Sequence, residues 1–253
     1  MKAFRLDPDR PLRILEIGCG PGALAEALHR WYPLAQITGV DRDSRFLSFA
    51  RENHPEITFL EGDAACLPFE DGSFDAAVSY TVQEHIEPSA FFGEQRRVLK
   101  TGGVCLCLSA RKGITCQAPC LSMSPEEKAF WDSFSQEEDD FEKYQVGRYR
   151  MSEAELPSVM EKNGFLHVTT EYAVADLAPD DPKYPPAMAE AMIEAMRQND
   201  LEAIGSMHSD RAQEAIAAVD RKYEERLRLY REGKKQWDTT VSLTMILRGE
   251  KER

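Results

Sequence analysis

The feature that most constrains the fold is an apolar run that leads into three closely spaced glycines. Residues 12–17 read Leu-Arg-Ile-Leu-Glu-Ile, which is typical of a buried parallel strand, and residues 23–30 continue as a predicted helix. Gly18, Gly20 and Gly22 lie between them, so the backbone can turn sharply and a ligand can lie against bare peptide. Because the first amides of a helix carry partial positive charge, this unit is typical of a nucleotide-type ligand site.

Two classes of ligand are compatible with such a turn. Gly18, Gly20 and Ala23 satisfy the dinucleotide pattern G-x-G-x-x-G/A, which favours an NAD(P)-binding oxidoreductase or epimerase. Glu16 favours the other class, because a carboxylate two residues before the first glycine would repel a pyrophosphate. The same carboxylate would attract the cationic amino and sulfonium groups of S-adenosylmethionine.

The segment Glu16-Ile-Gly-Cys-Gly-Pro-Gly22 resembles motif I of the class I S-adenosylmethionine-dependent methyltransferases. The resemblance implies an α/β fold: a Rossmann-like, seven-stranded, mostly parallel sheet with an antiparallel last strand and helices on both faces. It also implies that the cofactor is S-adenosyl-L-methionine. The residues of this motif expected to bind it are Glu16, Gly18, Cys19, Gly20 and Gly22.

Acidic residues follow the next two predicted strands, as the resemblance requires. The predicted strand at 36–40 runs into Asp41, which lies about 20 residues past the glycines. An acid at this place would hydrogen-bond ribose hydroxyls. Its neighbour Arg42 is included in the predicted cofactor site. After the third strand, the resemblance places Asp63 at the adenine amino group and the amide of Ala64 at the ring.

A further landmark precedes the fifth predicted strand. Residues 97–103 resemble the family's R-x-L-K-P-G-G turn, with Thr101 where proline is usual. That departure costs little, because proline there only pre-sets a turn. Residues 67–69 would flank the adenine base, and the landmarks together span residues 12–109.

The resemblance places the residues after the fourth strand at the transferring methyl group, which makes Tyr80, Glu84 and His85 the candidate catalytic residues. Tyr80 is also expected to contact the cofactor. A histidine is suited to general-base catalysis near neutral pH, and the alternative is that His85 only hydrogen-bonds the loop. Methyl transfer from a sulfonium is an in-line displacement, so a base is needed only when the acceptor has a proton to lose.

Composition and motifs favour a small-molecule acceptor. The formal net charge is −13 and no basic cluster is present, which argues against a nucleic-acid partner. Residues 79–82 read Ser-Tyr-Thr-Val and lack the Asp/Asn-Pro-Pro-Tyr/Phe motif of enzymes that methylate exocyclic amines. We therefore expect a methyltransferase of the small-molecule branch, which includes the quinone-biosynthesis C-methyltransferases. The alternatives are the NAD(P)-binding enzyme and a non-catalytic binding protein with the methyltransferase fold.

The sequence predicts a cytoplasmic protein without a membrane span or a metal site. No apolar run approaches the ~20 residues of a span, and the first residues lack the apolar core of a signal peptide. Six cysteines in such a chain suggest free thiols. Cys116 and Cys120 could offer a thiolate pair, but two further ligands are missing nearby.

The long segment at 110–150, after the fifth strand, is expected to help wall the substrate pocket, because such loops form the ligand crevice in open α/β sheets. Its acidic run at 137–140 is expected to be a solvated turn. A helix at 152–163 follows, with a capping box formed by Ser152 and Glu155. The aromatic residues of the long segment are Phe130, Trp131, Phe134, Phe141, Tyr144 and Tyr149.

A helical insertion is predicted between strands six and seven, at residues 179–236. It contains an amphipathic segment with several methionines on one side and a second helix at 210–232. We expect this insertion to be a lid or a dimer arm, which makes a homodimer a possible assembly. Residues 1–178 and 237–253 are expected to form the cofactor-binding core.

Overall fold

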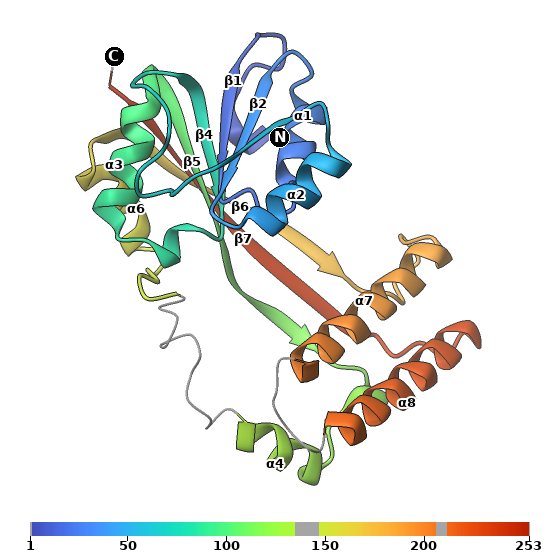
Figure 1. Cartoon of the computed structure of the whole chain (residues 1–253). Helices are drawn as coiled ribbons and strands as arrows, with labels where there is room; N and C mark the ends of the chain where they lie inside the picture. Colours follow the sequence, from blue (N-terminus) through green and yellow to red (C-terminus); the bar gives the residue numbers. More distant parts are fainter. Residues whose placement is uncertain (1, 135–146, 206–211, 253) are drawn as a thin grey trace. The chain divides into compact units, whose positions relative to one another are not determined.

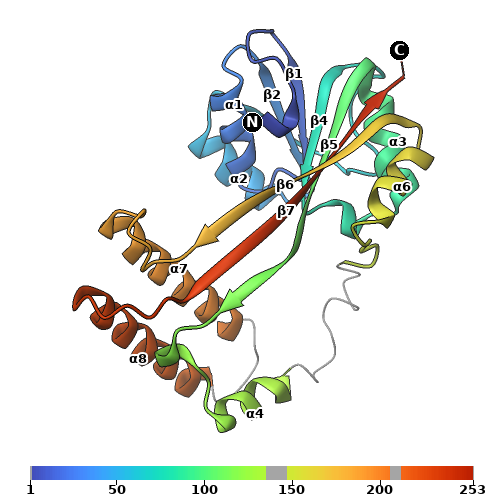
Figure 2. The ribbon, with the colours of Figure 1, turned by 180° about the vertical axis from the view of Figure 1, so that it is seen from behind.

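The computed structural model describes residues 2–134, 147–205 and 212–252, and the chain forms two compact units (Figures 1 and 2). The first unit comprises residues 1–111, 140–173 and 244–253, and the second comprises 112–139 and 174–243. The whole predicted insertion falls in the second unit. That unit is larger than the insertion, because it also takes residues 112–139 and the ends of three strands.

The sheet has seven strands in the order β3-β2-β1-β4-β5-β7-β6. The strands are β1 (Arg13–Ile17), β2 (Gln36–Asp41), β3 (Thr58–Glu61), β4 (Phe74–Tyr80), β5 (Leu99–Cys116), β6 (Phe165–Leu177) and β7 (Thr239–Lys251). The pairs β1–β2, β1–β4, β2–β3 and β4–β5 are parallel. β7 runs against its neighbours β5 and β6 (Figure 2). The predicted mostly parallel sheet with an antiparallel last strand is confirmed.

Helices connect these strands close to the predicted positions. The α-helices of the described segments are α1 (Ala23–Trp31), α2 (Ser44–Asn53), α3 (Pro88–Val98), α4 (Pro125–Phe134), α6 (Glu155–Lys162), α7 (Pro186–Gly205) and α8 (Ala212–Arg231). Short 3-10 turns are η1 (Lys2–Phe4), η2 (Gln83–His85) and η3 (Pro119–Leu121). The predicted capping box is present, because the Glu155 amide donates to Ser152 Oγ and the Ser152 amide donates to Glu155 Oε2.

Two apolar layers hold the helices of the first unit against the sheet. One layer contains Leu28 of α1 and Leu47 of α2, and the other contains Phe91 of α3 and Leu156 of α6. Successive side chains of a strand point to opposite faces, so Ile14 enters the first layer while Leu15 and Ile17 enter the second. Both faces of the sheet are therefore covered, as predicted, and the carboxyl ends of the parallel strands remain for the site.

The second unit has its own core, formed where α7 and α8 pack together and against η3. Arg226 of α8 is fully buried and forms ion pairs with Asp180 and Asp238. Asp180 also accepts hydrogen bonds from the amides of Gln236 and Trp237. One guanidinium thus joins α8 to the chain after β6 and the chain before β7. Within the described ranges no helix is long and apolar enough to cross a bilayer.

Candidate functional site

The glycine turn between β1 and α1 leaves its backbone bare at one position. Gly18, Gly20 and Gly22 have φ angles of 66°, 50° and 93°, a conformation that side chains with a Cβ rarely adopt. A Cβ on Gly18 would lie 2.3 Å from a methyl of Val82, and one on Gly22 would lie 3.0 Å from the Phe59 ring. A Cβ on Gly20 would meet nothing within 4 Å. Gly20 is therefore where a ligand can approach the peptide directly.

Glu16 lies two residues before this turn, with only 3% of its surface exposed. Burial raises its pKa to about 8, while a hydrogen bond from the Ala25 amide acts in the opposite direction. The second carboxyl oxygen, Oε2, has no hydrogen-bond partner. A buried polar atom without a partner is costly, so this oxygen is suited to receive a donor or a cation from a ligand.

Asp41, at the end of β2, is fixed against the glycine turn. Its Oδ2 accepts the Gly20 amide at 2.8 Å, and its Oδ1 accepts the Asp43 amide at 2.9 Å. An ionised carboxylate has about four acceptor positions, so two positions remain for ribose hydroxyls after these two bonds. The neighbouring Arg42 is exposed.

Asp63 and Ala64 follow β3 at the same edge of the sheet. Asp63 is exposed, and its Oδ1 accepts the amide of Ala65 at 2.8 Å, which sets a tight turn. Ala64 is half-buried and packs against the core layer that contains α3.

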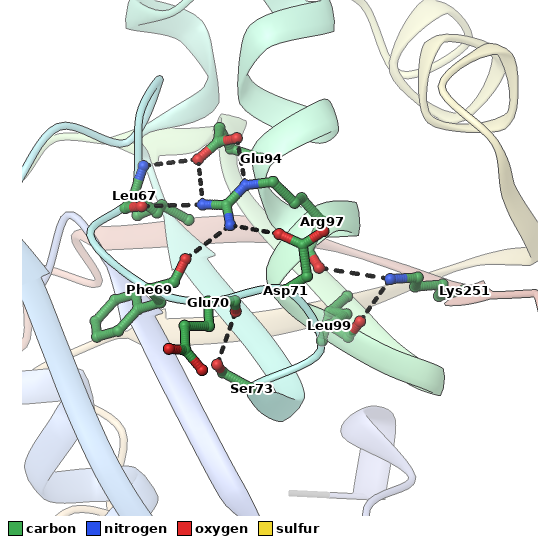
Figure 3. Close-up of polar contacts among 9 residues, drawn as sticks. All are labelled: Leu67, Phe69, Glu70, Asp71, Ser73, Glu94, Arg97, Leu99 and Lys251. Atoms are coloured by element: carbon green, nitrogen blue, oxygen red, sulfur yellow. Dashed lines mark hydrogen bonds and ion pairs between the residues drawn. The ribbon is translucent and has the colours of Figure 1, made fainter.

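The loop that follows Asp63 is bound to α3 by an arginine and a glutamate (Figure 3). Arg97 donates to the carbonyl of Leu67 at 2.9 Å, the carbonyl of Phe69 at 2.7 Å and Asp71 Oδ1 at 2.9 Å. Glu94 pairs with the same guanidinium through both oxygens and accepts the Leu67 amide at 2.7 Å. We call this the Arg97–Glu94 clamp. Sequence reasoning did not predict this role, although Arg97 opens the R-x-L-K-T-G-G segment.

The residues after β4 are in hydrogen-bond contact with the segment at 147–149. Tyr80 ends the strand with 43% of its surface exposed, and the next residue, Thr81, has a φ of 55°. Gln83 is buried and donates to the carbonyl of Tyr149 at 3.0 Å, while the Tyr149 amide donates to the carbonyl of Glu84 at 2.9 Å. Backbone contacts with this segment therefore fix the predicted catalytic loop.

His85 is held by the same segment. The Gly147 amide donates to His85 Nδ1 at 2.9 Å, so Nδ1 acts as the acceptor and the proton of the neutral ring resides on Nε2. A ring in this tautomer cannot take a proton at Nε2 while the bond from Gly147 persists. The geometry therefore favours the loop-holding role of His85 over that of a general base.

The sheet brings the predicted cofactor residues to one edge. Gly18 and Asp63 follow β1 and β3, and Asp41 and Tyr80 are the last residues of β2 and β4. These four strands are neighbours and parallel in their pairings. In open α/β sheets this carboxyl edge is where ligands bind. Cys19 differs, because its side chain is buried in the core and its thiol donates to the carbonyl of Gly20.

Other predicted features lie elsewhere. Cys116 and Cys120 belong to the second unit, and all six cysteines are free thiols. The acidic run 137–140, Phe141 and Tyr144 lie outside the described residues, as do the side chains of Phe130, Trp131 and Phe134.

Part of the chain is similar to known methyltransferases. Residues 15–107 match the model of the methyltransferase domain family. A fatty-acid O-methyltransferase from Mycolicibacterium smegmatis is 40% identical over 103 residues, which are 39% of this chain and 37% of that protein. A demethylmenaquinone methyltransferase from Chlorobaculum tepidum is 36% identical over 100 residues, 39% of this chain and 41% of that protein.

A solved structure shares the fold over the whole chain. Phosphoethanolamine N-methyltransferase 2 of Haemonchus contortus, in complex with S-adenosyl-L-methionine, has a TM-score of 0.56 and 20% identity. The match covers 100% of this chain and 51% of that chain. Over residues 15–107 the chain matches the methyltransferase domain family and is similar to methyltransferases of quinone biosynthesis. The chain matches only about two fifths of the length of these curated relatives.

Proposed function

We propose that this chain is an S-adenosylmethionine-dependent methyltransferase that acts on a small-molecule acceptor by in-line methyl transfer. The observation that carries the proposal is the partnerless buried oxygen of Glu16 beside the bare backbone at Gly20. A cationic ligand favours the ionised form of this carboxyl group, so the position suits the amino and sulfonium charges of S-adenosylmethionine and opposes a pyrophosphate. The relatives support the class of acceptor, since their names specify fatty acids and quinones.

Each predicted binding residue has a distinct task in this proposal. Asp41 accepts the ribose hydroxyls with the oxygen positions that its two backbone bonds leave available. Asp63 accepts the adenine amino group, and the Arg97–Glu94 clamp fixes the loop that flanks the base. Gly18, Gly20 and Gly22, with the backbone of Cys19, form the turn along the cofactor, and Arg42 lies exposed beside the ribose position.

The chain contributes orientation more than proton transfer. When bound, S-adenosylmethionine supplies an electrophilic methyl group on a good leaving group. Tyr80 and Glu84 present side chains after β4, where the acceptor is expected to meet that methyl. Alignment of acceptor and methyl is then the main source of rate enhancement. His85 holds the loop through Gly147, so an acceptor that carries a proton loses it to solvent or to Glu84.

Titration calorimetry with S-adenosylhomocysteine and with NADH tests the class of ligand. We expect binding of S-adenosylhomocysteine and none of NADH at the same concentration. Turnover of S-adenosylmethionine with a panel of hydroxyl, thiol, amine and activated-carbon acceptors then identifies the acceptor. Tight binding of NADH without binding of S-adenosylhomocysteine would overturn the proposal in favour of an oxidoreductase or epimerase. Binding without turnover of any acceptor would favour a non-catalytic binding protein.

We also propose a cytoplasmic location and a lid or dimer-arm role for residues 179–236. Six free thiols suit a reducing compartment. Met188 on α7 is half exposed, which suits an adaptable apolar contact with a ligand or a second copy. The mass of the protein in solution across a range of concentrations tests the dimer.

A further inference from the structure

Arg111 of β5 lies just past the carboxyl edge of the sheet. β5 pairs through Leu108 with Tyr80, the last residue of β4, and then continues beyond it. Arg111 is therefore three residues, or about 10 Å, past the end of β4. The acceptor is expected to meet the methyl group after β4, so Arg111 lies on the acceptor side of the proposed site. All the residues that carry the following argument belong to the first unit.

The guanidinium of Arg111 is largely buried but has few acceptors among the described residues. Only 12% of the side chain is exposed. Nη1 donates to the Met151 carbonyl at 2.7 Å, and Nη2 donates at 3.5 Å to the thioether of Met245, a weak acceptor. Nε is buried and has no hydrogen-bond partner. The edge formed by Nε and Nη2 therefore lacks an oxygen at hydrogen-bond distance, although a carboxylate can engage such an edge with two parallel bonds.

One carboxylate lies near this edge without completing it. Glu153 Oε1 is 3.7 Å from Arg111 Nε, which is too far for a hydrogen bond. The Glu153 side chain is 55% exposed, so water screens its charge and it compensates the guanidinium only weakly. An anion that reached the same edge would form the two short bonds that Glu153 does not form.

The surroundings favour a single negative charge on that anion. Burial raises the pKa of the Cys107 thiol to about 12; among the smaller effects Glu84 raises it and Arg111 lowers it, so both charges lie near this thiol. A carboxylate balances one guanidinium. A phosphate monoester would bring nearly two negative charges toward Glu84 and Glu153, which would repel it.

We infer that Arg111 selects a methyl acceptor that carries a carboxylate group, which binds along the Nε–Nη2 edge. The inference rests on the proposed function and names the class of its substrate. Because the carboxylate gives both oxygens to the guanidinium, it serves as the anchor, and the methyl group goes to another atom of the same molecule. Glu84 lies near enough to face that part of the acceptor.

Matched acids and amides test the inference on the full chain saturated with S-adenosylhomocysteine. The probes are octanoate and benzoate, each compared with its primary amide, which has the same skeleton and no charge. In titration calorimetry we expect each acid to bind at least about tenfold more tightly than its amide. The Arg111 Nε–H signal in ¹⁵N NMR spectra, assigned by its loss in Arg111→Met, should shift with the acids and not with the amides.

Variants test whether the preference for the acid comes from Arg111. Arg111→Met should remove it, and Arg111→Lys should keep only part of it, because lysine lacks the planar fork. Arg96→Met is the matched control, since Arg96 is half-buried and donates to one carbonyl, that of Gly164. Glu153→Gln should strengthen binding of the acids and leave binding of the amides unchanged, because it removes the charge that competes for the edge.

The outcomes distinguish this inference from the proposed function. Failure of S-adenosylhomocysteine to bind contradicts the proposed function, and the inference falls with it. If S-adenosylhomocysteine binds, the inference alone is overturned by any of three results: no binding of either acid at millimolar concentration, equal binding of acid and amide, or an unchanged preference in a folded Arg111→Met protein. Weaker binding of S-adenosylhomocysteine itself to Arg111→Met would place the cofactor's own carboxylate at Arg111 and would also overturn it.

Discussion

At the scale of single residues, the proposed cofactor site depends on two carboxyl groups in different surroundings. Asp41 accepts two backbone amides, whereas Glu16 is buried with one oxygen unpartnered. The two groups are therefore tested by different substitutions.

For Asp41, we expect Asp41→Asn to weaken binding of S-adenosylhomocysteine by roughly 1.5–3 kcal/mol, the usual value of hydrogen bonds to a charged group. The amide retains one acceptor oxygen but loses the charge. Calorimetry measures the change, with Glu52→Gln on the exposed side of α2 as the control. Unchanged affinity in a folded Asp41→Asn protein would contradict the ribose assignment.

For Glu16, we expect a pH-dependent loss of stability in the ligand-free protein. Burial raises its pKa from 4.5 to about 8, so its contribution to stability is fully present below pH 4.5 and is lost as pH rises through 8. The loss reaches up to about 1.4 kcal/mol per pH unit between those values. Glu16→Gln stays neutral at every pH. In urea unfolding, the free energy of unfolding of the variant relative to that of the wild type should therefore increase from pH 5 to pH 8.5.

Parallel pH profiles for Glu16→Gln and the wild type would contradict that assignment. A second measurement connects the group to its ligand. Because a cationic ligand favours the carboxylate, binding of S-adenosylmethionine at pH 7 should release a proton in the wild type and not in Glu16→Gln. Calorimetry in two buffers of different ionisation enthalpy detects this release.

At the scale of elements, the Arg97–Glu94 clamp connects α3 to the loop that we propose flanks the adenine base. We expect Arg97→Met to weaken binding of S-adenosylhomocysteine by about tenfold, because charge-assisted bonds to two loop carbonyls are lost. Amide exchange in residues 64–72 should rise in the same variant. Arg30→Met removes an exposed surface pair on α1 and serves as the control, since such pairs contribute little. Tenfold weaker binding without faster loop exchange would contradict a positioning role.

The sequence predicted the elements of the first unit well, because strand and helix periodicity are local signals. The first turn of α2 shows the limit of local reasoning. α2 begins at Ser44, yet its capping residue is Asp43, whose side chain accepts the amide of Arg45. Both residue types cap helices, so the choice between neighbours depends on backbone angles that the sequence does not show.

Contacts between distant segments could not be predicted from the pattern. His85 appeared as a candidate base because of its place after β4, and its partner Gly147 lies 62 residues away. The sequence places Arg97 in a turn, and its partners in the loop after Asp63 lie about 30 residues earlier. The strand β5 extends to Cys116, past residue 110 where the long segment was expected to begin, because ladder pairing with neighbouring strands compensates for weak local preference.

At the scale of the whole molecule, the two roles proposed for residues 179–236, lid and dimer arm, predict different patterns of amide hydrogen exchange. A lid gains protection when its ligand binds, because lids are drawn from the less stable parts of a structure. We expect amides in the segment 188–196 to gain protection with S-adenosylhomocysteine and an acceptor analogue. Equal protection in both states, with a mass that depends on concentration, would instead make this segment a permanent dimer interface.

The buried Arg226 makes the opening of the second unit a collective event. Its two carboxylate partners, Asp180 and Asp238, are buried and lie beyond β6 and before β7, so α8 cannot detach without leaving charges unpaired in the interior. Residues 178–181, 236–238 and the middle of α8 should therefore share one opening free energy in native-state hydrogen exchange as denaturant increases. Arg226→Met should lower that value by about 3–5 kcal/mol for all three segments at once. If α8 amides exchanged at a much lower opening free energy than the amides of the two flanking segments, the helix would open alone. The guanidinium would then not couple α8 to those segments.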